Sequence, residues 1–251
     1  MLQLKNVVKD FDGLRAVHDV SLRIEGGQLV GLIGPNGSGK STLINVISGT
    51  LKPSAGQINF NDHNITHFAP NAIFNLGLAR GFQDPALFFQ MTALDNMLLP
   101  AKDQKGEHPW YAPWRRFWLT QEKTNAGFAD QILRRVKLRE SSHKPAADLS
   151  GGQMKLLDIA RCLVGEPKML LLDEPTAGVA PALAYEIFEQ IAELRKTLGF
   201  TFLIVEHRLE ILFDFVDYIY VMHMGEILAQ GTPDEIKSNV STREVYFGVD
   251  E

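Results

Sequence analysis

The chain has 251 residues, a formal net charge of -5 at pH 7 and one cysteine. This length fits one large core or two modest lobes. The acidic net charge argues against nucleic acid or anionic lipid as the main partner, although it is compatible with a local basic patch. A single cysteine, Cys162, excludes an internal disulfide and is expected to be an inert core thiol. The first residues lack the charged and apolar regions of a secretory signal, which favours the cytoplasm. Runs of about 18 uncharged apolar residues are absent, so we do not expect the chain to cross a membrane.

Five segments of the chain predict strands of two kinds. Apolar and polar residues alternate over 2–7 and 20–24, which is the pattern of half-exposed antiparallel strands. Residues 29–33 form a continuous apolar run, and 168–172 and 201–205 repeat that character. Such runs are typical of parallel strands that are buried on both faces. We therefore expect an α/β fold with a mostly parallel sheet and a small flanking antiparallel sheet.

Helical periodicity dominates the middle of the chain. Apolar positions recur at helical spacing within 88–164, most clearly over 129–136, which predicts a helical subdomain inserted into the α/β core. The remaining elements are a helix over about 181–197, a hairpin that turns near Gly225, and a short helix that Thr232 caps.

The segment Gly34–Thr42 matches the phosphate-loop pattern G-x-x-x-x-G-K-[ST] between a predicted strand and a predicted helix. Backbone N–H groups of such a loop wrap phosphates, and the helix N-terminus favours anions. Lys40 supplies charge to the β- and γ-phosphates, and the Ser41 hydroxyl is placed to bind Mg²⁺. A glycine-rich turn without chemistry is the alternative, but the loop, the lysine, the hydroxyl and the flanking strand agree. The expected phosphate-binding residues are Gly34, Pro35, Asn36, Gly37, Ser38, Gly39, Lys40, Ser41 and Thr42.

Two acidic residues follow the second apolar strand directly. Asp173 closes this strand and Glu174 comes next, so both carboxylates should leave the sheet at its carboxyl edge, beside the phosphate loop. We expect Asp173 to hold Mg²⁺ and Glu174 to polarise an attacking water. Paired acids at a strand end usually belong to a solvated turn. The presence of a phosphate loop in the same chain is what favours a functional site here.

A second anion-binding device is predicted near residue 150. Leu149–Gln153 precedes an apolar run over 154–163, which places Ser150, Gly151 and Gly152 at a helix N-terminus, followed by Gln153. A capped helix with glycines is the alternative. Two phosphate cradles far apart in one chain require an explanation.

These three segments, in this order, resemble the nucleotide-binding subunit of an ABC (ATP-binding cassette) transporter, and the resemblance extends from Leu2 to Gly248. It implies a P-loop ABC ATPase fold in one nucleotide-binding domain, 1–251, with a core over 1–85 and 166–251 and a helical subdomain over about 86–165. It also implies ATP and Mg²⁺ as cofactors. In this family the Leu-Ser-Gly-Gly-Gln segment of one subunit closes on the γ-phosphate held by the other, which explains the second cradle.

The resemblance assigns further roles residue by residue. Phe11 falls where the family stacks an aromatic ring on adenine; the family usually has Tyr there, and Phe keeps the ring face. Gln83 matches the glutamine that senses Mg²⁺ and the γ-phosphate, and His207 matches the switch histidine that contacts the γ-phosphate. One position departs from the pattern, because Ala180 stands where the family usually has Asp or Asn, which make hydrogen bonds across the dimer.

Within the family, three features are similar to the ATPases of branched-chain amino acid importers and their relatives for urea and amides: the segment 102–127, the pair Glu206–His207 and the ending 244–248. This implies an ATPase motor on the cytoplasmic face of the inner membrane, held there by transmembrane permease subunits. The other implied partners are a second ABC ATPase subunit, the same or different, and a solute-binding protein, without nucleic acid. The alternatives are a lipopolysaccharide-export-type ABC ATPase and a soluble ABC ATPase that is not a transporter. A P-loop kinase would have no use for Leu149–Gln153.

One aromatic run has no place in this assignment. Pro113 is able to open a helix in which Trp114, Phe117 and Trp118 share one face. Internal packing of the helical subdomain is one explanation, and contact with a membrane subunit or with lipid is the other.

Overall fold

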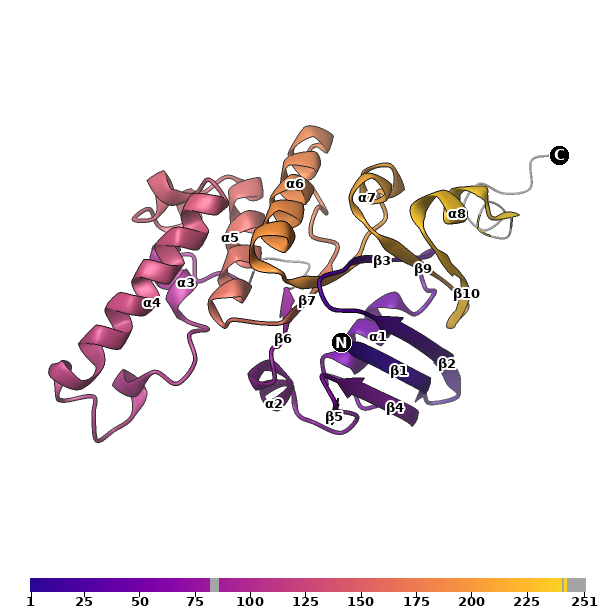
Figure 1. Ribbon diagram of the computed structural model, residues 1–251, viewed down its shortest axis with the longest axis horizontal. Helices are drawn as coiled ribbons and strands as arrows, with labels where there is room; N and C mark the ends of the chain where they lie inside the picture. Colours follow the sequence, from indigo (N-terminus) through magenta and orange to yellow (C-terminus); the bar gives the residue numbers. More distant parts are fainter. Residues whose placement is uncertain (82–85, 241, 243–251) are drawn as a thin grey trace.

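The computed structural model describes residues 1–81, 86–240 and 242, and its centre is a six-stranded sheet (Figure 1). The strands are β3 (Leu29–Ile33), β6 (Leu78–Gly81), β7 (Met169–Asp173), β8 (Thr201–Val205), β9 (Tyr218–His223) and β10 (Glu226–Gly231). Their order is β10-β9-β3-β8-β7-β6, with β10 antiparallel to β9 and the other neighbours parallel. Every residue of β3, β7 and β8 is buried, so the prediction of parallel strands covered on both faces is confirmed.

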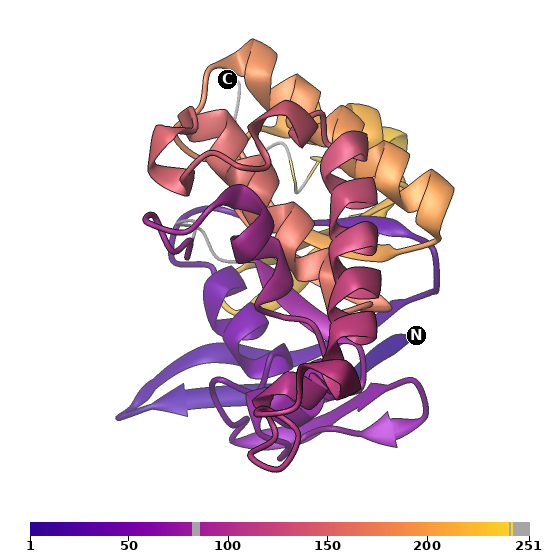
Figure 2. The same ribbon diagram turned by 90° about the vertical axis from the view of Figure 1, so that its left-hand side faces the viewer.

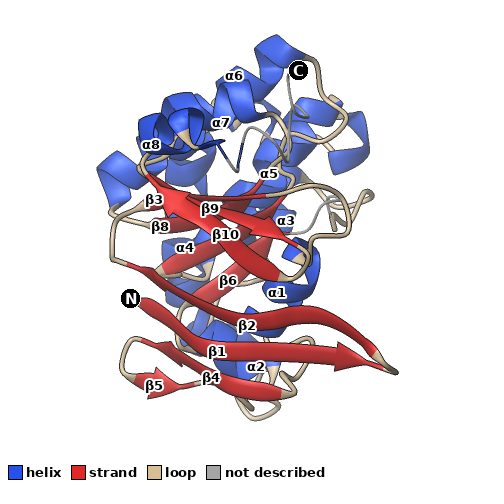
Figure 3. Ribbon diagram, turned by 90° about the vertical axis from the view of Figure 1, so that its right-hand side faces the viewer, coloured by secondary structure: helices blue, strands red, loops and turns tan. Residues whose placement is uncertain are grey.

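The predicted antiparallel sheet forms a second layer beside the first (Figure 3). Its strands are β1 (Leu2–Phe11), β2 (Leu14–Ile24), β4 (Ala55–Phe60) and β5 (His63–Asn64), in the order β2-β1-β4-β5. Within β1, Leu2 and Leu4 are buried while Lys5 is exposed. This alternation arises because one face of the sheet packs on the core and the other faces solvent.

Apolar residues of β3 alternate between two cores, one on each face of the larger sheet. The helices around this sheet are α1 (Lys40–Ile47), α2 (Pro70–Asn75), α6 (Pro181–Leu198), α7 (Leu209–Phe215) and α8 (Pro233–Ser238). Leu29 and Ile33 belong to the core under α6 and α7, whereas Val30 and Leu32 belong to the core shared with α1 and the antiparallel sheet. Thr232 caps α8 in a capping box with Glu235, which confirms the predicted start of this helix.

The middle of the chain is helical, as predicted. The helices α3 (Ala93–Leu98), α4 (Arg115–Arg135) and α5 (Gly151–Val164) pack on one another at one side of the molecule (Figures 1 and 2). Three short 3-10 turns, Lys105–Glu107, Arg139–Ser141 and Ala146–Asp148, connect them. In the part of the chain that the structure describes, no helix combines the length and apolar character that a membrane crossing requires.

Cys162 lies in α5 and is buried, as expected of a core thiol. Burial raises the pKa of this thiol to about 12. The thiol is therefore protonated at neutral pH, and since the thiolate is the reactive form, Cys162 is chemically inert.

The core under α6 provides a stability prediction. Phe188 is fully buried and stacks on Phe215 with ring centroids 5.5 Å apart. We expect Phe188→Ala to lower the free energy of unfolding by about 3–5 kcal/mol in urea denaturation, because it leaves a cavity that the sheet and helix cannot fill. Phe68→Ala, at a ring that is 41% exposed, is the matched control and should change it by less than about 1 kcal/mol. Equal losses would show that burial does not decide the effect.

Candidate nucleotide-binding site

The parallel strands deliver three predicted segments to one edge of the sheet. Leu32 of β3 and Asp173 of β7 both pair with Val205 of β8. The residues that follow these three strands therefore leave the sheet side by side at its carboxyl edge. This is where open α/β sheets bind ligands.

The predicted phosphate loop folds around its own lysine. The Lys40 ammonium group donates hydrogen bonds to the carbonyl oxygens of Gly34 at 2.8 Å and Pro35 at 2.9 Å. Burial lowers the pKa of Lys40, while the carboxylates of Glu174 and Asp173 oppose this shift. The lysine is thus held in the loop beside both acids, and it leads directly into α1, whose second residue is the exposed Ser41.

Close packing explains two glycines of this loop. A Cβ on Gly39, which has φ +101°, would lie 2.4 Å from the carbonyl oxygen of Ala16 on β2. A Cβ on Gly34 would lie 2.2 Å from the carbonyl oxygen of Met222 on β9. No Cβ atom is able to lie so close to a carbonyl oxygen, so only glycine fits at these two positions. The loop is therefore packed tightly against both β2 and β9.

Asp173 has a cationic partner that the sequence analysis did not name. Arg80, on the neighbouring strand β6, approaches the Asp173 carboxylate at 3.4 Å and donates to the Asn45 side chain of α1 at 2.5 Å. Burial raises the pKa of Asp173, and the Arg80 guanidinium opposes that shift. A charged residue inside a buried strand needs an oppositely charged or hydrogen-bonding partner. The arginine within the apolar strand β6 was therefore the feature of the sequence that could have indicated this pair.

Glu174 and His207 meet directly. The Glu174 Oε1 atom lies 2.9 Å from His207 Nε2, although the two residues follow different strands. Glu174 has φ +49°, and its N–H donates to the Val205 carbonyl oxygen at 2.9 Å. A non-glycine residue held in the left-handed region is frequent at functional sites. The structure therefore brings together two of the three residues that the sequence predicts to act in catalysis, and the third, Gln83, falls outside the described residues.

Glu206 connects the two loops that carry these residues. Its carboxylate is 3% exposed, and Oε1 accepts hydrogen bonds from the N–H of Thr176, at 3.1 Å, and from the Thr176 hydroxyl. Oε2 accepts from the N–H groups of His207 at 2.9 Å and Arg208 at 3.3 Å. One buried carboxylate therefore fixes the loop after β7 to the loop after β8.

The segment around Ala180 is anchored within the chain. The Arg208 guanidinium donates to the Val179 carbonyl oxygen at 2.6 Å. Ala180 itself is the N-cap residue of α6, with Pro181 as the first helical residue, and provides no side-chain cap. A methyl group leaves this helix start without the side-chain acceptor that Asp or Asn would supply.

The second predicted cradle lies apart from the first. Ser150 is the N-cap of α5, and it forms a capping box with Gln153 through bonds of 3.0 and 3.3 Å. Gly151 faces open space, whereas a Cβ on Gly152 would meet the Leu183 side chain at 2.2 Å. Among the described residues, no hydrogen bond or ion pair joins this segment to Gly34–Thr42.

Two predicted residues give less information. Phe11 is 40% exposed at the end of β1, with the Lys9 ammonium 4.9 Å from its ring centroid. Its role at adenine stays a prediction. Gln83 falls outside the described residues, as does the ending 244–248.

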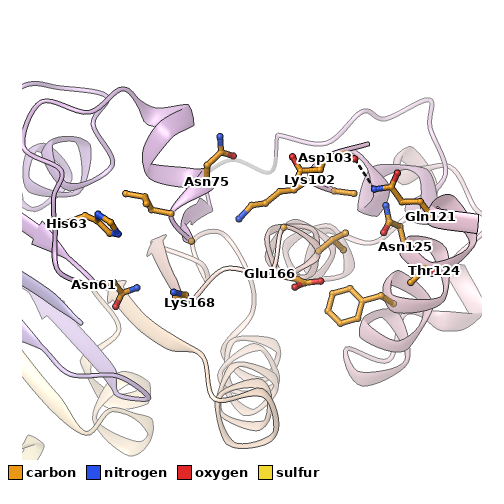
Figure 4. A pocket seen from close by; sticks show the side chains of 16 residues that line it. Asn61, His63, Asn75, Lys102, Asp103, Gln121, Thr124, Asn125, Glu166 and Lys168 are labelled. Carbon is orange, nitrogen blue, oxygen red and sulfur yellow. Dashed lines mark hydrogen bonds between the residues drawn. The ribbon is translucent and has the colours of Figure 1, made fainter. Parts of the chain in front are cut away.

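A cleft of about 720 Å³ lies away from these residues (Figure 4). Gly77 and Lys168, which precede β6 and β7, place it toward the amino edge of the sheet, away from the phosphate loop. Core residues line one side and α4 residues such as Gln121 and Asn125 line the other (Figure 4). Its charges are mixed, with Lys102 and Lys168 against Asp103 and Glu166, so it does not compete with the phosphate loop as a nucleotide site.

The family model of the ABC transporter matches residues 17–177, which contain the phosphate loop, Leu149–Gln153 and the Asp173–Glu174 pair. The chain belongs to the ABC transporter family. It is 42% identical to the "Probable branched-chain amino acid transport ATP-binding protein LivG" of Methanocaldococcus jannaschii, over 99% of this chain and 97% of that protein.

Two solved structures extend the comparison. The ADP conformation of an ATP-binding cassette of an ABC transporter is similar with a TM-score of 0.86 and 41% identity, over 99% of each chain. A dimeric post-hydrolysis cassette bound to ADP and phosphate is similar with a TM-score of 0.75 and 26% identity, over 93% of this chain and 99% of that one. The predicted fold and the assignment of the chain as an ABC ATPase are therefore confirmed.

The bonds of Glu206 generate a prediction for this ABC ATPase. Glu206→Gln keeps the shape but places an amide NH₂ where one oxygen accepted two donors, so one of the two loops is released. We expect kcat for ATP hydrolysis to fall about tenfold or more with nearly unchanged ATP affinity, and the free energy of unfolding to fall by about 1–3 kcal/mol. Steady-state kinetics, nucleotide titration and urea denaturation measure the three quantities.

The exposed carboxylate of Glu25, paired with Arg23, gives the matched control, and Glu25→Gln should alter none of them. A Glu206→Gln protein with normal kcat and reduced stability would show that Glu206 supports the fold without positioning the loops.

Proposed function

We propose that this chain is the ATP-hydrolysing motor subunit of an ABC importer for branched-chain amino acids or a related small polar solute. The observation that carries the proposal is the 2.9 Å contact of Glu174 with His207 beside the lysine of the phosphate loop. The amino acid transport relative named above supports the importer class over lipopolysaccharide export and over a soluble ATPase. The solute itself would be selected by partner subunits.

Nucleotide binding follows from the loop. Backbone N–H groups of Gly34–Thr42 and the start of α1 offer donors to the phosphates, and the Lys40 ammonium, already held in place, adds a positive charge. Phe11 would stack on adenine. Ser150–Gln153 would contact the γ-phosphate held by a second copy or a related subunit.

The residues at the carboxyl edge fit Mg²⁺. The Ser41 hydroxyl and the Asp173 carboxylate are hard oxygen donors of the kind that Mg²⁺ prefers, and Asp173 is buried near Lys40. These two residues, with Gln83, would hold the ion. When bound, Mg²⁺ neutralises charge on the phosphate oxygens.

Hydrolysis would use Glu174 and His207. The Glu174 carboxylate orients a water for attack on the γ-phosphorus and accepts its proton, while the bond to ADP breaks and phosphate is released. His207, which contacts Glu174 through Nε2, holds this carboxylate and would reach the γ-phosphate. Glu206 keeps the loops of both residues at one separation.

Partners are proposed from the relatives and from the site. The dimeric cassette supports a pairing of two such subunits. In the pairing that we propose, each phosphate loop faces the Ser150–Gln153 segment of the other subunit. Transmembrane permease subunits would hold the dimer at the cytoplasmic face of the inner membrane, and a solute-binding protein would deliver solute. No role for nucleic acid is proposed.

The helical subdomain, 86–165, is proposed to move as a unit against the core, 1–85 and 166–251. Two features support this division. The helices α3, α4 and α5 pack on one another, and the polar cleft of Figure 4 separates α4 from core residues such as Lys168.

Two substitutions separate binding from hydrolysis. Glu174→Gln keeps shape and hydrogen bonding but removes the basic carboxylate, so kcat should fall by about 10²–10⁴ while ATP still binds. With hydrolysis blocked, the protein should shift from monomer to dimer on addition of ATP, as light scattering would show. Lys40→Ala should instead weaken ATP binding about tenfold or more, because a charged donor to the phosphates is lost.

ADP and nucleotide-free samples serve as controls for the scattering experiment. Wild-type hydrolysis by Glu174→Gln would contradict the catalytic assignment. A variant that binds ATP and remains monomeric, even with permease subunits present, would contradict the sandwich.

Ala180 leaves both the start of α6 and the proposed dimer contact without a side-chain acceptor. Its methyl group neither caps α6 nor makes hydrogen bonds across a dimer. We expect Ala180→Asp to raise the Hill coefficient of ATP hydrolysis in the assembled complex, because a cross-subunit acceptor is restored. The same change should raise the free energy of unfolding of the isolated chain by about 0.5–2 kcal/mol through the new cap. Higher stability with an unchanged Hill coefficient would limit the effect to α6.

A further inference from the structure

The residues between α3 and α4, together with the first turn of α4, have a defined shape of their own. We call residues 105–118 the tryptophan segment, since all three tryptophans of the chain, at 110, 114 and 118, lie in it. Trp118 is half-buried: its Nε1 donates to the Ala112 carbonyl oxygen at 3.1 Å, and its ring packs near Gly106. The N–H of Lys105 donates to the Gln121 side chain of α4 at 2.9 Å. These contacts fix the segment on the first turns of α4.

The other large aromatic residues of the tryptophan segment point outward. Trp110 is 79% exposed and Trp114 58% exposed, and Tyr111 and Phe117 are each close to half exposed. The helix α4 begins at Arg115, so Trp114 is its N-cap residue. The sequence places Trp114, Phe117 and Trp118 on one helix face. In the structure Trp118 is half-buried, whereas Trp114 and Phe117 are exposed to solvent. Such a cluster on a soluble surface marks an interaction site.

The charge of the tryptophan segment is opposite to that of the chain. It holds three basic residues and one acidic residue, a net charge of +2, whereas the chain has -5. Arg115 and Arg116 adjoin the exposed rings, and the Arg116 guanidinium lies 4.9 Å from the Phe117 ring centroid. The segment projects from the end of the molecule opposite α8 (Figures 1 and 2).

We infer that the tryptophan segment binds the surface of an anionic phospholipid bilayer. Tryptophan and tyrosine rings favour the headgroup region because they combine an apolar body with a polar edge, and arginines beside them attract anionic headgroups. A fixed segment loses little entropy on binding. The inference rests on the proposed function, since permease subunits would hold the chain close to the bilayer, where one weak contact suffices to orient it.

The experiment uses the full chain, without nucleotide, and vesicles of phosphatidylcholine with or without phosphatidylglycerol. We expect cosedimentation and a blue shift of tryptophan emission only with phosphatidylglycerol, both reduced by salt. Tryptophan emission reports on this segment alone, since it contains every tryptophan. Arg115→Glu with Arg116→Glu should lower partitioning by at least about tenfold, and Trp110→Ser with Trp114→Ser should abolish the blue shift.

Lys5→Glu with Lys196→Glu changes two exposed lysines elsewhere by the same total charge and should leave partitioning nearly unchanged. Equal binding to neutral vesicles, or equal loss in both charge variants, would overturn the inference. So would a blue shift that requires permease subunits and never occurs with lipid alone, which would identify a protein partner. ATP hydrolysis is measured separately, without vesicles. A protein that hydrolyses ATP and does not bind anionic vesicles contradicts this inference only. A protein that binds the vesicles and does not hydrolyse ATP contradicts the proposed function only.

Discussion

The parallel register of β3, β8 and β7 is the constraint on which the site depends. Val205 of the middle strand is paired with Leu32 on one side and with Asp173 on the other. A slip of one residue in either pairing would move the following loop by about 3.3 Å and turn its side chains to the opposite face. The contact of Glu174 with His207 would then be lost. Burial of both faces of these strands specifies the register. The same apolar residues that form the core of the sheet therefore also determine the geometry of the site.

Hydrogen bonds between the loops after β7 and β8 fix the distance between them, which the strand register alone does not set. Strand pairing places the loops after β7 and β8 side by side, but the Glu206 carboxylate sets their separation through Thr176 and the backbone of His207. Arg208 extends this connection to Val179, next to the position where the family usually carries an acidic or amide side chain. The chain thus stabilises this segment from within, without a side-chain acceptor at position 180.

Local features of the site were predictable from the sequence, and contacts between distant residues were not. The phosphate loop is a continuous segment whose backbone shape follows from its glycines, so its motif and its structure agree. The pair Arg80–Asp173 joins two neighbouring strands, and the pair Glu206–Thr176 joins the loops that follow two neighbouring strands. Both pairs depend on a strand order that one sequence does not specify. The aromatic face shows a different outcome. Periodicity assumes a helix through Trp114 and Trp118, but α4 starts at Arg115 and the Trp118 indole donates to the carbonyl oxygen of Ala112, which precedes the helix.

The capping box at α5 limits how the second cradle is able to act in the proposed dimer. Ser150 and Gln153 already satisfy each other, because each side chain accepts the backbone N–H of the other residue. The first N–H groups of a helix have no partner within it. The donors left for a phosphate are therefore the backbone N–H groups of Gly151 and Gly152, the hydroxyl hydrogen of Ser150 and the side-chain NH₂ of Gln153, since only Oε1 of that amide is used in the capping box. Gly151 is open to an approaching anion, while the fit of Gly152 against Leu183 ties the cradle to α6. Since α6 begins just after the segment that Arg208 anchors, contacts run without interruption from the cradle through α6 to the residue that follows His207.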